Sequence, residues 1–319
     1  MLKVLLIKTS SLGDVVHNLP VATDIRSRFP DARIDWVVEE GYAPLVALHP
    51  AVANVIPVAI RRWRRSLLRA STWGEIGDLR RRFRKEQYDT VIDTQGLVKS
   101  ALLARAARGR RHGFDAGSAR EALAARFYDV QHPIPRDQHA VIRNRALAAA
   151  ALGYRAEGMA DYGIRVSAPA PAAGEAVPYC VLLHGTSRDD KLWPVERWVR
   201  LGRELEARGL RCLLPSGSDD ERRRSELIAA ALGNSLVPAL TPLAGMAPLL
   251  ARAAAVIGVD TGLTHLAAAL GVPVVALYCG SDPVLTGVHE ARRARNLGWP
   301  GAAPEVPEVL EALGALGVA

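Results

Sequence analysis

Cysteine and metal-binding patterns are scarce in this chain of 319 residues. The three cysteines, Cys180, Cys212 and Cys279, are odd in number, far apart, and set in or beside apolar runs. Such cysteines are typical of buried free thiols rather than of disulfides or a metal site. No His and Cys cluster has zinc-like spacing, and the Asp-x-Asp pattern with which many sugar-nucleotide enzymes hold a divalent metal does not occur. We therefore expect neither a bound metal nor a cofactor.

Long apolar runs are also missing. No uninterrupted apolar stretch reaches the length of a membrane span, and the run Val4–Ile7 is too short for a secretory signal peptide. We therefore expect a cytoplasmic protein. Its length is sufficient for two domains with their own cores.

Two common phosphate-binding motifs are absent as well. No G-x-G-x-x-G follows a strand-like run, which argues against a nicotinamide-linked oxidoreductase, and no G-x-x-x-x-G-K-[ST] indicates a P-loop. Aromatic residues make up only 5% of the chain, and no known nucleic-acid-binding module is recognisable, so surfaces on which bases stack are scarce. We expect no nucleic-acid partner.

Basic residues are present in excess but unevenly, and the formal net charge is +8. Residues 1–170 hold 27 Lys and Arg against 17 Asp and Glu, whereas residues 171–319 hold 14 against 16. The densest runs are residues 61–65, which include Trp63, and residues 80–85. A basic half indicates an anionic partner, which is a nucleic acid, an acidic membrane surface or a polyanionic substrate. Solvated helix faces explain the 80–85 run equally well.

Strand-like and helix-like patterns alternate in both halves of the chain. In the first half we predict strands at residues 3–8, 33–40 and 89–96, and helices at residues 14–30, 41–50 and 97–107. In the second half we predict strands at residues 179–185, 211–218, 254–260 and 273–280, and helices at residues 194–209, 219–233, 242–253 and 261–271. This βαβ rhythm predicts an α/β protein with two Rossmann-like, doubly wound domains that face each other across a cleft. We place the domains at residues 1–165 and 179–300, with a Pro- and Ala-rich linker at 166–178 and a final segment at 301–319.

Three turns in the second half offer groups that suit a diphosphate. Asp260, Thr261 and Gly262 join a strand to a helix, whose N-terminal N–H groups attract anions. The stretch HGTSRDDK, residues 184–191, supplies small donors and the cation Lys191. The stretch PSGSDDER, residues 215–222, supplies Glu221, which suits sugar hydroxyls but also an ordinary charged helix start.

The opening loop KTSSLGD, residues 8–14, follows the first predicted strand. Its small residues suit close approach by a ligand, yet Asp14 would repel an anion. One interpretation of Asp14 from the residues alone is a helix N-cap, which would fix the position of its carboxylate.

Several stretches together resemble the lipopolysaccharide heptosyltransferases, and among these the type I members. They run from about residue 1 to about residue 290 and include KTSSLGDVVHNLP, VIPVAIRRWRR, DTVIDTQGLVKSA, LHGTSRDDKLWP and VDTGLTHLAAALG. The resemblance implies a GT-B glycosyltransferase that moves heptose from ADP-heptose to the Kdo sugar of Kdo-lipid A, with inversion and without a metal. It also implies a monomer at the cytoplasmic face of the inner membrane, an acceptor-binding first domain, a donor-binding second domain, and a C-terminal helix that packs back toward the first domain.

The resemblance also implies roles for individual residues. Asp14 corresponds to the catalytic base. The donor would be bound by Ser10, Gly13, Thr186, Ser187, Lys191, Glu221, Thr241, Asp260, Thr261, Gly262 and His265. The acidic acceptor gives the basic half a purpose, and for it we predict Arg61, Arg62, Arg64, Gln95, Lys99 and Arg120. Leu67 and Leu68 beside these arginines predict shallow contact with anionic lipid.

Two departures from the family pattern affect the donor pocket. Gly185-Thr186-Ser187 stands where Ala-Thr-Thr is usual, and Ser216 stands where Trp is usual. Three other functions stay open at this point. They are transfer of the second or third heptose, a nicotinamide-linked oxidoreductase, and a nucleic-acid-binding protein.

Overall fold

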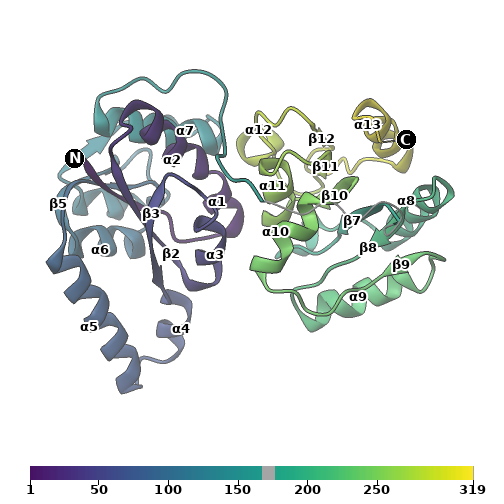
Figure 1. Ribbon diagram of the computed structural model, residues 1–319, viewed down its shortest axis with the longest axis horizontal. Coiled ribbons are helices and arrows are strands. Elements are labelled where there is room, and N and C mark those ends of the chain that lie inside the picture. Colours follow the sequence, from purple (N-terminus) through teal and green to yellow (C-terminus); the bar gives the residue numbers. More distant parts are fainter. Residues whose placement is uncertain (167–176, 319) are drawn as a thin grey trace. The chain divides into compact units, whose positions relative to one another are not determined.

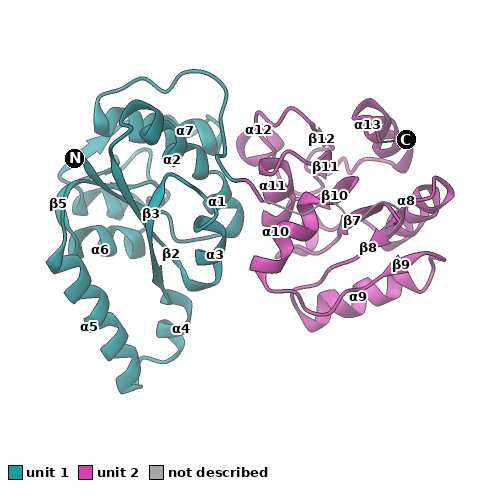
Figure 2. Ribbon diagram, viewed as in Figure 1, with its two compact units in different colours: residues 1–164 teal, residues 165–319 magenta. Residues whose placement is uncertain are grey.

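The chain forms two compact units, residues 1–164 and 165–319 (Figure 2). The computed structural model describes residues 1–166 and 177–318. The predicted end of the first domain at residue 165 adjoins this division, and most of the predicted linker lies outside the described residues.

The first unit is built on a parallel sheet with the strand order β3-β2-β1-β4-β5-β6 (Figure 1). The strands are β1 (Lys3–Ile7), β2 (Arg33–Glu39), β3 (Val52–Val58), β4 (Gln87–Asp93), β5 (Arg108–Phe114) and β6 (Val130–His132). This is the doubly wound order, in which the carboxyl ends of β1 and β4 flank the switch point where ligands bind. The sequence patterns for β1, β2 and β4 are confirmed, whereas β3, β5 and β6 were not predicted.

Helices cover the sheet of the first unit. They are α1 (Leu12–Val16), α2 (Leu19–Arg28), α3 (Ala43–Val46), α4 (Ile60–Arg65), α5 (Ala70–Lys85), α6 (Val98–Ala106) and α7 (Ala140–Leu152). Leu5, Ile7 and Val91 form one apolar cluster with Ala101 and Ala104 of α6. Helices α2 and α7 pack against each other, and α7 also packs on β4. The strand ends that carry the site are therefore supported by a closely packed apolar core.

The second unit repeats the same topology with the strand order β12-β11-β10-β7-β8-β9. Its strands are β7 (Tyr179–Leu183), β8 (Arg211–Leu213), β9 (Ser235–Leu236), β10 (Ala255–Val259), β11 (Val274–Leu277) and β12 (Ala294–Leu297). Its helices are α8 (Val195–Ala207), α9 (Asp219–Ala229), α10 (Leu243–Ala251), α11 (Gly262–Ala269), α12 (Pro283–Thr286) and α13 (Val306–Ala315). All four predicted strands and all four predicted helices occur. The α/β class and the two doubly wound sheets are thus confirmed.

One of the predicted helices is in fact two separate helices. The pattern at residues 14–30 predicted one helix, but the chain forms α1 and α2 with a break at His17 and Asn18. Pro20 lies in the first turn of α2, where its missing N–H is not needed. The helix that carries Asp14 is therefore only five residues long, Leu12–Val16.

The C-terminal helix α13 packs its buried face into the core of the second unit. Val306, Val309 and Leu313 share an apolar cluster with Trp198 of α8 and Leu277 of β11. Its predicted packing toward the first domain stays a prediction. Among the described residues, no helix is both long and apolar enough to span a bilayer.

Gly258 sets how closely α11 approaches its sheet. A Cβ at this position in β10 would lie 2.2 Å from Oγ1 of Thr264 and 3.0 Å from Cβ of Leu183. We predict that Gly258→Ala lowers the free energy of unfolding by about 1–3 kcal/mol, the usual cost of overpacking a core. Urea unfolding measures this loss. Gly314→Ala is the control, because a Cβ there meets nothing within 4 Å, and an unfolding curve of Gly258→Ala equal to that of the control would contradict the prediction.

Candidate active site

A buried lysine anchors the opening loop of the first unit. Lys8 directly follows β1 and is only 4% exposed. Its Nζ donates to the carbonyl oxygen of Thr94 at 2.7 Å and to Oδ1 of Asn144 at 3.3 Å. Both acceptors are neutral. The positive charge beneath the loop is therefore not cancelled by a carboxylate bonded to it, and burial lowers the pKa of Lys8 to about 8.

Gln95 fixes the path of the same loop from the end of β4. Its Oε1 accepts the backbone N–H groups of Thr9 at 3.0 Å and Ser10 at 3.1 Å. Gln95 is buried, and its Nε2 has no hydrogen-bond partner among the described residues. Gln95 thus positions the loop, and its predicted acceptor contact stays a prediction.

Asp14 lies in the first turn of α1, three residues after Ser11. The N-cap is Ser11 rather than Asp14, so the N-cap interpretation of Asp14 is wrong. Oδ2 of Asp14 accepts the N–H of Ser11 at 2.8 Å, its hydroxyl at 3.2 Å, and Nη1 of Arg120 at 3.2 Å. Among the described residues, no hydrogen bond engages Oδ1 of Asp14. The carboxylate is held in place through one oxygen, and the other is available to accept a proton.

Surrounding charges keep Asp14 ionised. Burial would raise its pKa, but the charges of Lys8 and Arg120 and the hydrogen bonds from Ser11 and Arg120 hold the pKa below its ordinary value. The side chain is 23% exposed. A substrate hydroxyl can therefore reach a carboxylate that carries its charge at neutral pH.

Lys99 and Arg120, which were predicted to bind the acceptor, both contact residues of the opening loop or of the first turn of α1, and their role stays a prediction. Nζ of Lys99 donates to Oγ of Ser10 at 3.1 Å. Burial lowers the pKa of Lys99, the charge of Glu39 opposes this shift, and the charges of Arg61, Arg64 and Arg120 add to it. Like charges thus gather at this edge of the sheet.

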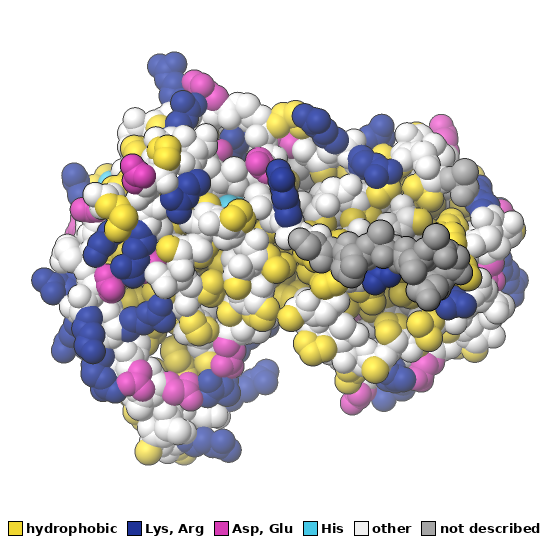
Figure 3. Space-filling model, in the orientation of Figure 1, with side chains coloured by type: hydrophobic (Ala, Val, Ile, Leu, Met, Phe, Trp, Pro, Cys, Tyr) yellow, Lys and Arg dark blue, Asp and Glu magenta, His cyan; other side chains and the backbone are white. Residues whose placement is uncertain are grey.

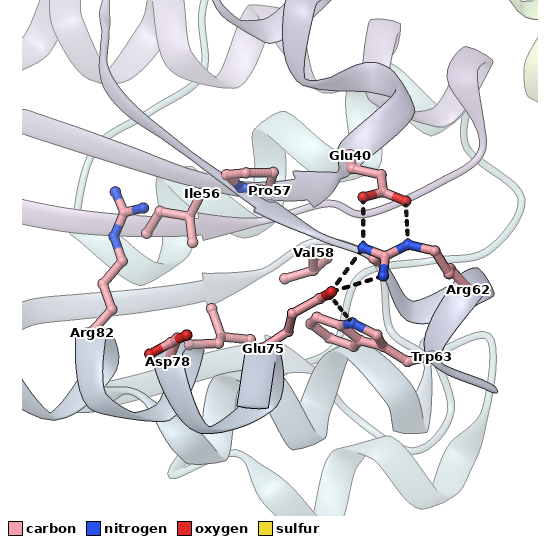
Figure 4. Close-up of a pocket in the computed structure, with 11 residues that line it drawn as sticks. Glu40, Ile56, Pro57, Val58, Arg62, Trp63, Glu75, Asp78 and Arg82 are labelled. Carbon is pink, nitrogen blue, oxygen red and sulfur yellow. Dashed lines mark hydrogen bonds and ion pairs between the residues drawn. The ribbon is translucent and has the colours of Figure 1, made fainter. Parts of the chain in front are cut away.

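Arg62 differs from its neighbours because it is already paired. Its guanidinium bonds both carboxylate oxygens of Glu40 and both of Glu75, at 2.9 to 3.1 Å. Trp63 donates its Nε1 to Glu75 at 2.6 Å. Figure 4 shows Arg62 between the two carboxylates at a cavity of about 330 Å³ beside β3. These contacts fix α4 on α5, so Arg62 is a positioning residue in this structure and the unpaired charges of α4 belong to its other arginines.

Asp260 is the centre of the site in the second unit. Its Oδ2 accepts Nζ of Lys191 and the hydroxyl of Ser281, both at 2.6 Å, and its Oδ1 lies 3.3 Å from Nε2 of His265. Thr186 donates its hydroxyl to the carbonyl oxygen of Asp260 at 3.1 Å. Burial would raise the pKa of Asp260, but His265, Lys191 and Ser281 hold it far below its ordinary value. The predicted residues Thr186, Lys191, Asp260 and His265 thus form one hydrogen-bonded group.

The other predicted donor residues lie at the carboxyl ends of neighbouring strands. Thr261 caps α11 and Gly262 is its first residue. Glu221 accepts the N–H of Gly217 at 2.6 Å, and a Cβ on Gly185 would lie 2.7 Å from its carboxylate. Glu221 therefore lies against the turns after both β7 and β8, and a side chain at position 185 would require its carboxylate to shift.

Three positions are less closely tied to this group. Ser187 is exposed after β7. The hydroxyl of Thr241 donates to the carbonyl of Ala239 at 2.8 Å. The Oγ of Ser216 is buried with no hydrogen-bond partner in the described part of the chain. The roles of all three stay predictions.

Some contributors were not predicted. Ser281 follows β11 outside the quoted stretches, and Lys8 follows β1 as the first residue of the stretch KTSSLGDVVHNLP, in which it was given no role. Their common signal is position, because each is a polar residue directly after or close behind a buried parallel strand. No cluster of three or more His, Cys, Asp or Glu suited to a metal ion occurs among residues 1–166 and 177–318.

Comparison with known proteins identifies a family for this geometry. A model of "Glycosyltransferase family 9 (heptosyltransferase)" matches residues 76–308. The chain is 48% identical over 290 residues to lipopolysaccharide heptosyltransferase 1 of Pseudomonas aeruginosa, which covers 90% of this chain and 81% of that protein. It is 27% identical over 327 residues to lipopolysaccharide heptosyltransferase 2 of Escherichia coli, which covers 92% of this chain and 88% of that one. The structure of E. coli heptosyltransferase WaaC with ADP-2-deoxy-2-fluoro heptose superposes with a TM-score of 0.87 at 41% identity, over 98% of this chain and 99% of that one.

The charge of Lys8 predicts a measurable effect on Asp14. Because Lys8 lowers the pKa of Asp14, Lys8→Met should raise that pKa, and the carboxylate should take up its proton at higher pH than in the wild type. Carboxyl-carbon NMR titration measures this change. Lys3→Met serves as the control, since Lys3 pairs with Glu86 at the other end of β1. An unchanged Asp14 titration in Lys8→Met would show that the ammonium does not act on the carboxylate.

Proposed function

The chain belongs to glycosyltransferase family 9, the heptosyltransferases, and from this premise we propose that it transfers heptose from ADP-heptose to the Kdo sugar of Kdo-lipid A during synthesis of the lipopolysaccharide inner core. The higher identity to type 1 than to type 2 relatives supports addition of the first heptose. The observation that carries the proposal is Asp14, an ionised carboxylate with one unengaged oxygen at a basic sheet edge. A monomer acting at the membrane surface is part of the proposal.

The reaction is a single displacement at the anomeric carbon. Oδ1 of Asp14 takes the proton of the acceptor hydroxyl, and the hydroxyl oxygen forms the new bond to the anomeric carbon. The bond from that carbon to the diphosphate oxygen breaks on the opposite face, and ADP departs with its electron pair. Attack from the face opposite the leaving group inverts the configuration.

Negative charge that develops on the departing diphosphate needs fixed donors in the second unit. Lys191 keeps one N–H bond to Asp260, and an ammonium carries two more donors for phosphate oxygens. The N-terminus of α11 directly after Asp260 adds backbone N–H groups. Asp260 therefore orients the cation rather than contacting the diphosphate itself, and these groups support transfer without a metal.

The acceptor carries acid groups, which the first unit is equipped to bind. Arg61 and Arg64 lie on α4 and Lys99 lies on α6. In the described part of the chain none of the three forms an ion pair with a carboxylate. They are therefore available for carboxylates or phosphates of the acceptor, whereas Arg62 would first have to leave Glu40 and Glu75.

The turn between α4 and α5 supports contact with an anionic membrane. Leu67, Leu68 and Trp73 are exposed there, and Arg65 and Arg69 flank the two leucines in the sequence. Figure 3 shows Lys and Arg side chains over the end of the first unit that α4 and α5 form. Apolar side chains among arginines suit shallow insertion between anionic headgroups.

The base assignment predicts a loss of turnover with binding preserved. Asp14→Asn removes the proton acceptor but keeps the shape, so the turnover rate with Kdo-lipid A should fall about 10²–10⁴-fold. Affinity for ADP-heptose should stay near that of the wild type, because the donor-binding residues of the second unit are untouched. ADP release and donor titration measure the two quantities. Asp31→Asn is the matched control, and wild-type turnover in Asp14→Asn would end the assignment.

The same assay tests the metal-free mechanism and the acceptor. ADP release should continue in EDTA at the rate found without it. Product analysis with Kdo-lipid A and with an already heptosylated acceptor decides between addition of the first and of a later heptose. Loss of activity in EDTA, restored by a divalent ion, would contradict the metal-free step.

The membrane contact predicts salt-sensitive binding to anionic vesicles. The double variant Leu67→Asp, Leu68→Asp should lose most co-sedimentation with phosphatidylglycerol vesicles, because it removes apolar contact and adds repulsive charge. Leu227→Asp is the control, since Leu227 is also exposed but lies on α9 of the second unit. Equal sedimentation of both variants would argue against this surface.

A further inference from the structure

Two arginines bond the segment Ser118–Arg120, which follows β5 at the same sheet edge as Asp14, and the segment ends in a third arginine. Arg143, on α7, donates Nη2 to the carbonyl of Ser118 at 2.6 Å. Arg136, which precedes α7, donates Nη2 to the carbonyls of Ala119 and Arg120. Arg120 itself donates to Asp14. We name Arg120, Arg136 and Arg143 the arginine triad.

The triad has little negative charge to balance it. Asp115 accepts the N–H of Ser118 at 2.8 Å and Glu121 accepts the N–H of Val98 at 2.7 Å, and neither of them, nor Asp137 beside Arg136, forms an ion pair with the triad in the described part of the chain. Among the described residues, Asp14 is the carboxylate that pairs with a member of the triad. Lys8 is a further basic group nearby. Besides burial, the charges of Arg120 and Arg143 lower the pKa of Lys8.

Arg143 is partly buried and incompletely bonded. Its guanidinium lies 4.8 Å from the centre of the Phe114 ring, and its Nε is buried with no hydrogen-bond partner among the described residues. A neutral donor would be sufficient to hold one carbonyl. Keeping three guanidiniums close together costs free energy that an anionic ligand would offset, because it satisfies the remaining donors and separates the like charges.

We propose that Arg136 and Arg143 join Arg120 in a subsite that binds the carboxylate of the sugar acid to which the heptose is transferred. This inference rests on the proposed function. Arg120 bonds Asp14 at 3.2 Å, so the triad begins within one sugar's width of the hydroxyl that Asp14 deprotonates. The acceptor Kdo carries its carboxylate on the same sugar as that hydroxyl, whereas the phosphates of lipid A lie on other sugars. Guanidiniums bind carboxylates through paired, planar hydrogen bonds.

The test compares steady-state kinetics of Arg136→Met, Arg143→Met and Arg143→Lys with Kdo-lipid A. Methionine keeps an apolar stem over Phe114, and Arg136 is exposed, so its variant does not disturb the core. Each methionine variant should raise the acceptor KM about tenfold to a hundredfold, the loss expected for one charge-assisted hydrogen bond. The donor KM and the rate at saturating acceptor should change less than about twofold, since both report groups outside the subsite. Arg143→Lys should recover part of the loss.

Arg105→Met is the matched control, because it removes an exposed positive charge from α6 of the same unit without touching the triad. Its acceptor KM should equal that of the wild type. An unchanged acceptor KM in both triad methionine variants, with urea unfolding like that of the wild type, would overturn the proposal.

Two modified acceptors separate a carboxylate from a phosphate. A Kdo methyl ester should raise the KM of the wild type to that of the triad variants and should cost the variants nothing more. A dephosphorylated acceptor should weaken wild type and variants by the same factor. The opposite pattern would assign the triad to a phosphate and contradict the carboxylate subsite.

Calorimetric titration with free Kdo distinguishes failure of this inference from failure of the proposed function. If the wild type binds free Kdo and the Arg136→Met and Arg143→Met variants do not, the result supports the subsite even when no ADP is released. Turnover by the wild type with equal Kdo affinity in all variants would leave the proposed function intact and refute the subsite.

Discussion

Contacts between cations and carboxylates at the ends of parallel strands are the arrangement on which the candidate site of each unit depends. In the second unit, the carboxylate of Asp260 accepts hydrogen bonds from Lys191 and Ser281 and contacts His265. In the first unit the balance is reversed, since one carboxylate, Asp14, lies among several positive groups. Because a buried or crowded charge is unfavourable without a partner, the first arrangement is satisfied internally, and the second keeps positive charge available for a ligand.

The sheet order brings these residues together from distant parts of the sequence. In each unit the strands run parallel, so their carboxyl ends meet at one edge of the sheet. The chain adds strands first on one side of the first strand and then on the other, which creates the switch point at that edge. Lys8, Gln95 and Arg120 follow three adjacent strands, β1, β4 and β5. Thr186 and Asp260 follow β7 and β10 in the same way. The hydrogen bonds between them are consequences of this order rather than of nearness in sequence.

Sequence patterns predicted what depends on periodicity and motif. Buried strands such as β1 and β10 and the amphipathic helix α8 are continuous apolar patterns, and they were found. The edge strand β3 and the Arg-rich β5 were missed because exposed and charged residues interrupt their apolar runs. The break at His17 and Asn18 was missed because Pro20, a proline inside a helical pattern, is compatible both with a kink and with the first turn of a new helix. Arg62 looked like its neighbours in sequence, and only the tertiary contacts with Glu40 and Glu75 separate it from them. Lys8 is marked in the sequence only by its position after a buried strand, and its burial depends on the distant residues Thr94 and Asn144.

The lowered pKa of Asp14 bears on its role as a base. A carboxylate stabilised by Lys8 and Arg120 is ionised at neutral pH, yet the same charges weaken its pull on a proton. In the mechanism that we propose, an acidic acceptor changes this balance. When its carboxylate pairs with the arginine triad, part of the positive charge felt by Asp14 is neutralised, and the pKa of Asp14 rises toward its ordinary value. Asp14 then becomes a stronger base at the moment a hydroxyl is in reach, while Lys8, which carries its charge below a pH of about 8, still stabilises the negative charge that develops on the attacking oxygen. The cations that make Asp14 a weak base in the free protein therefore make its activation dependent on the acceptor.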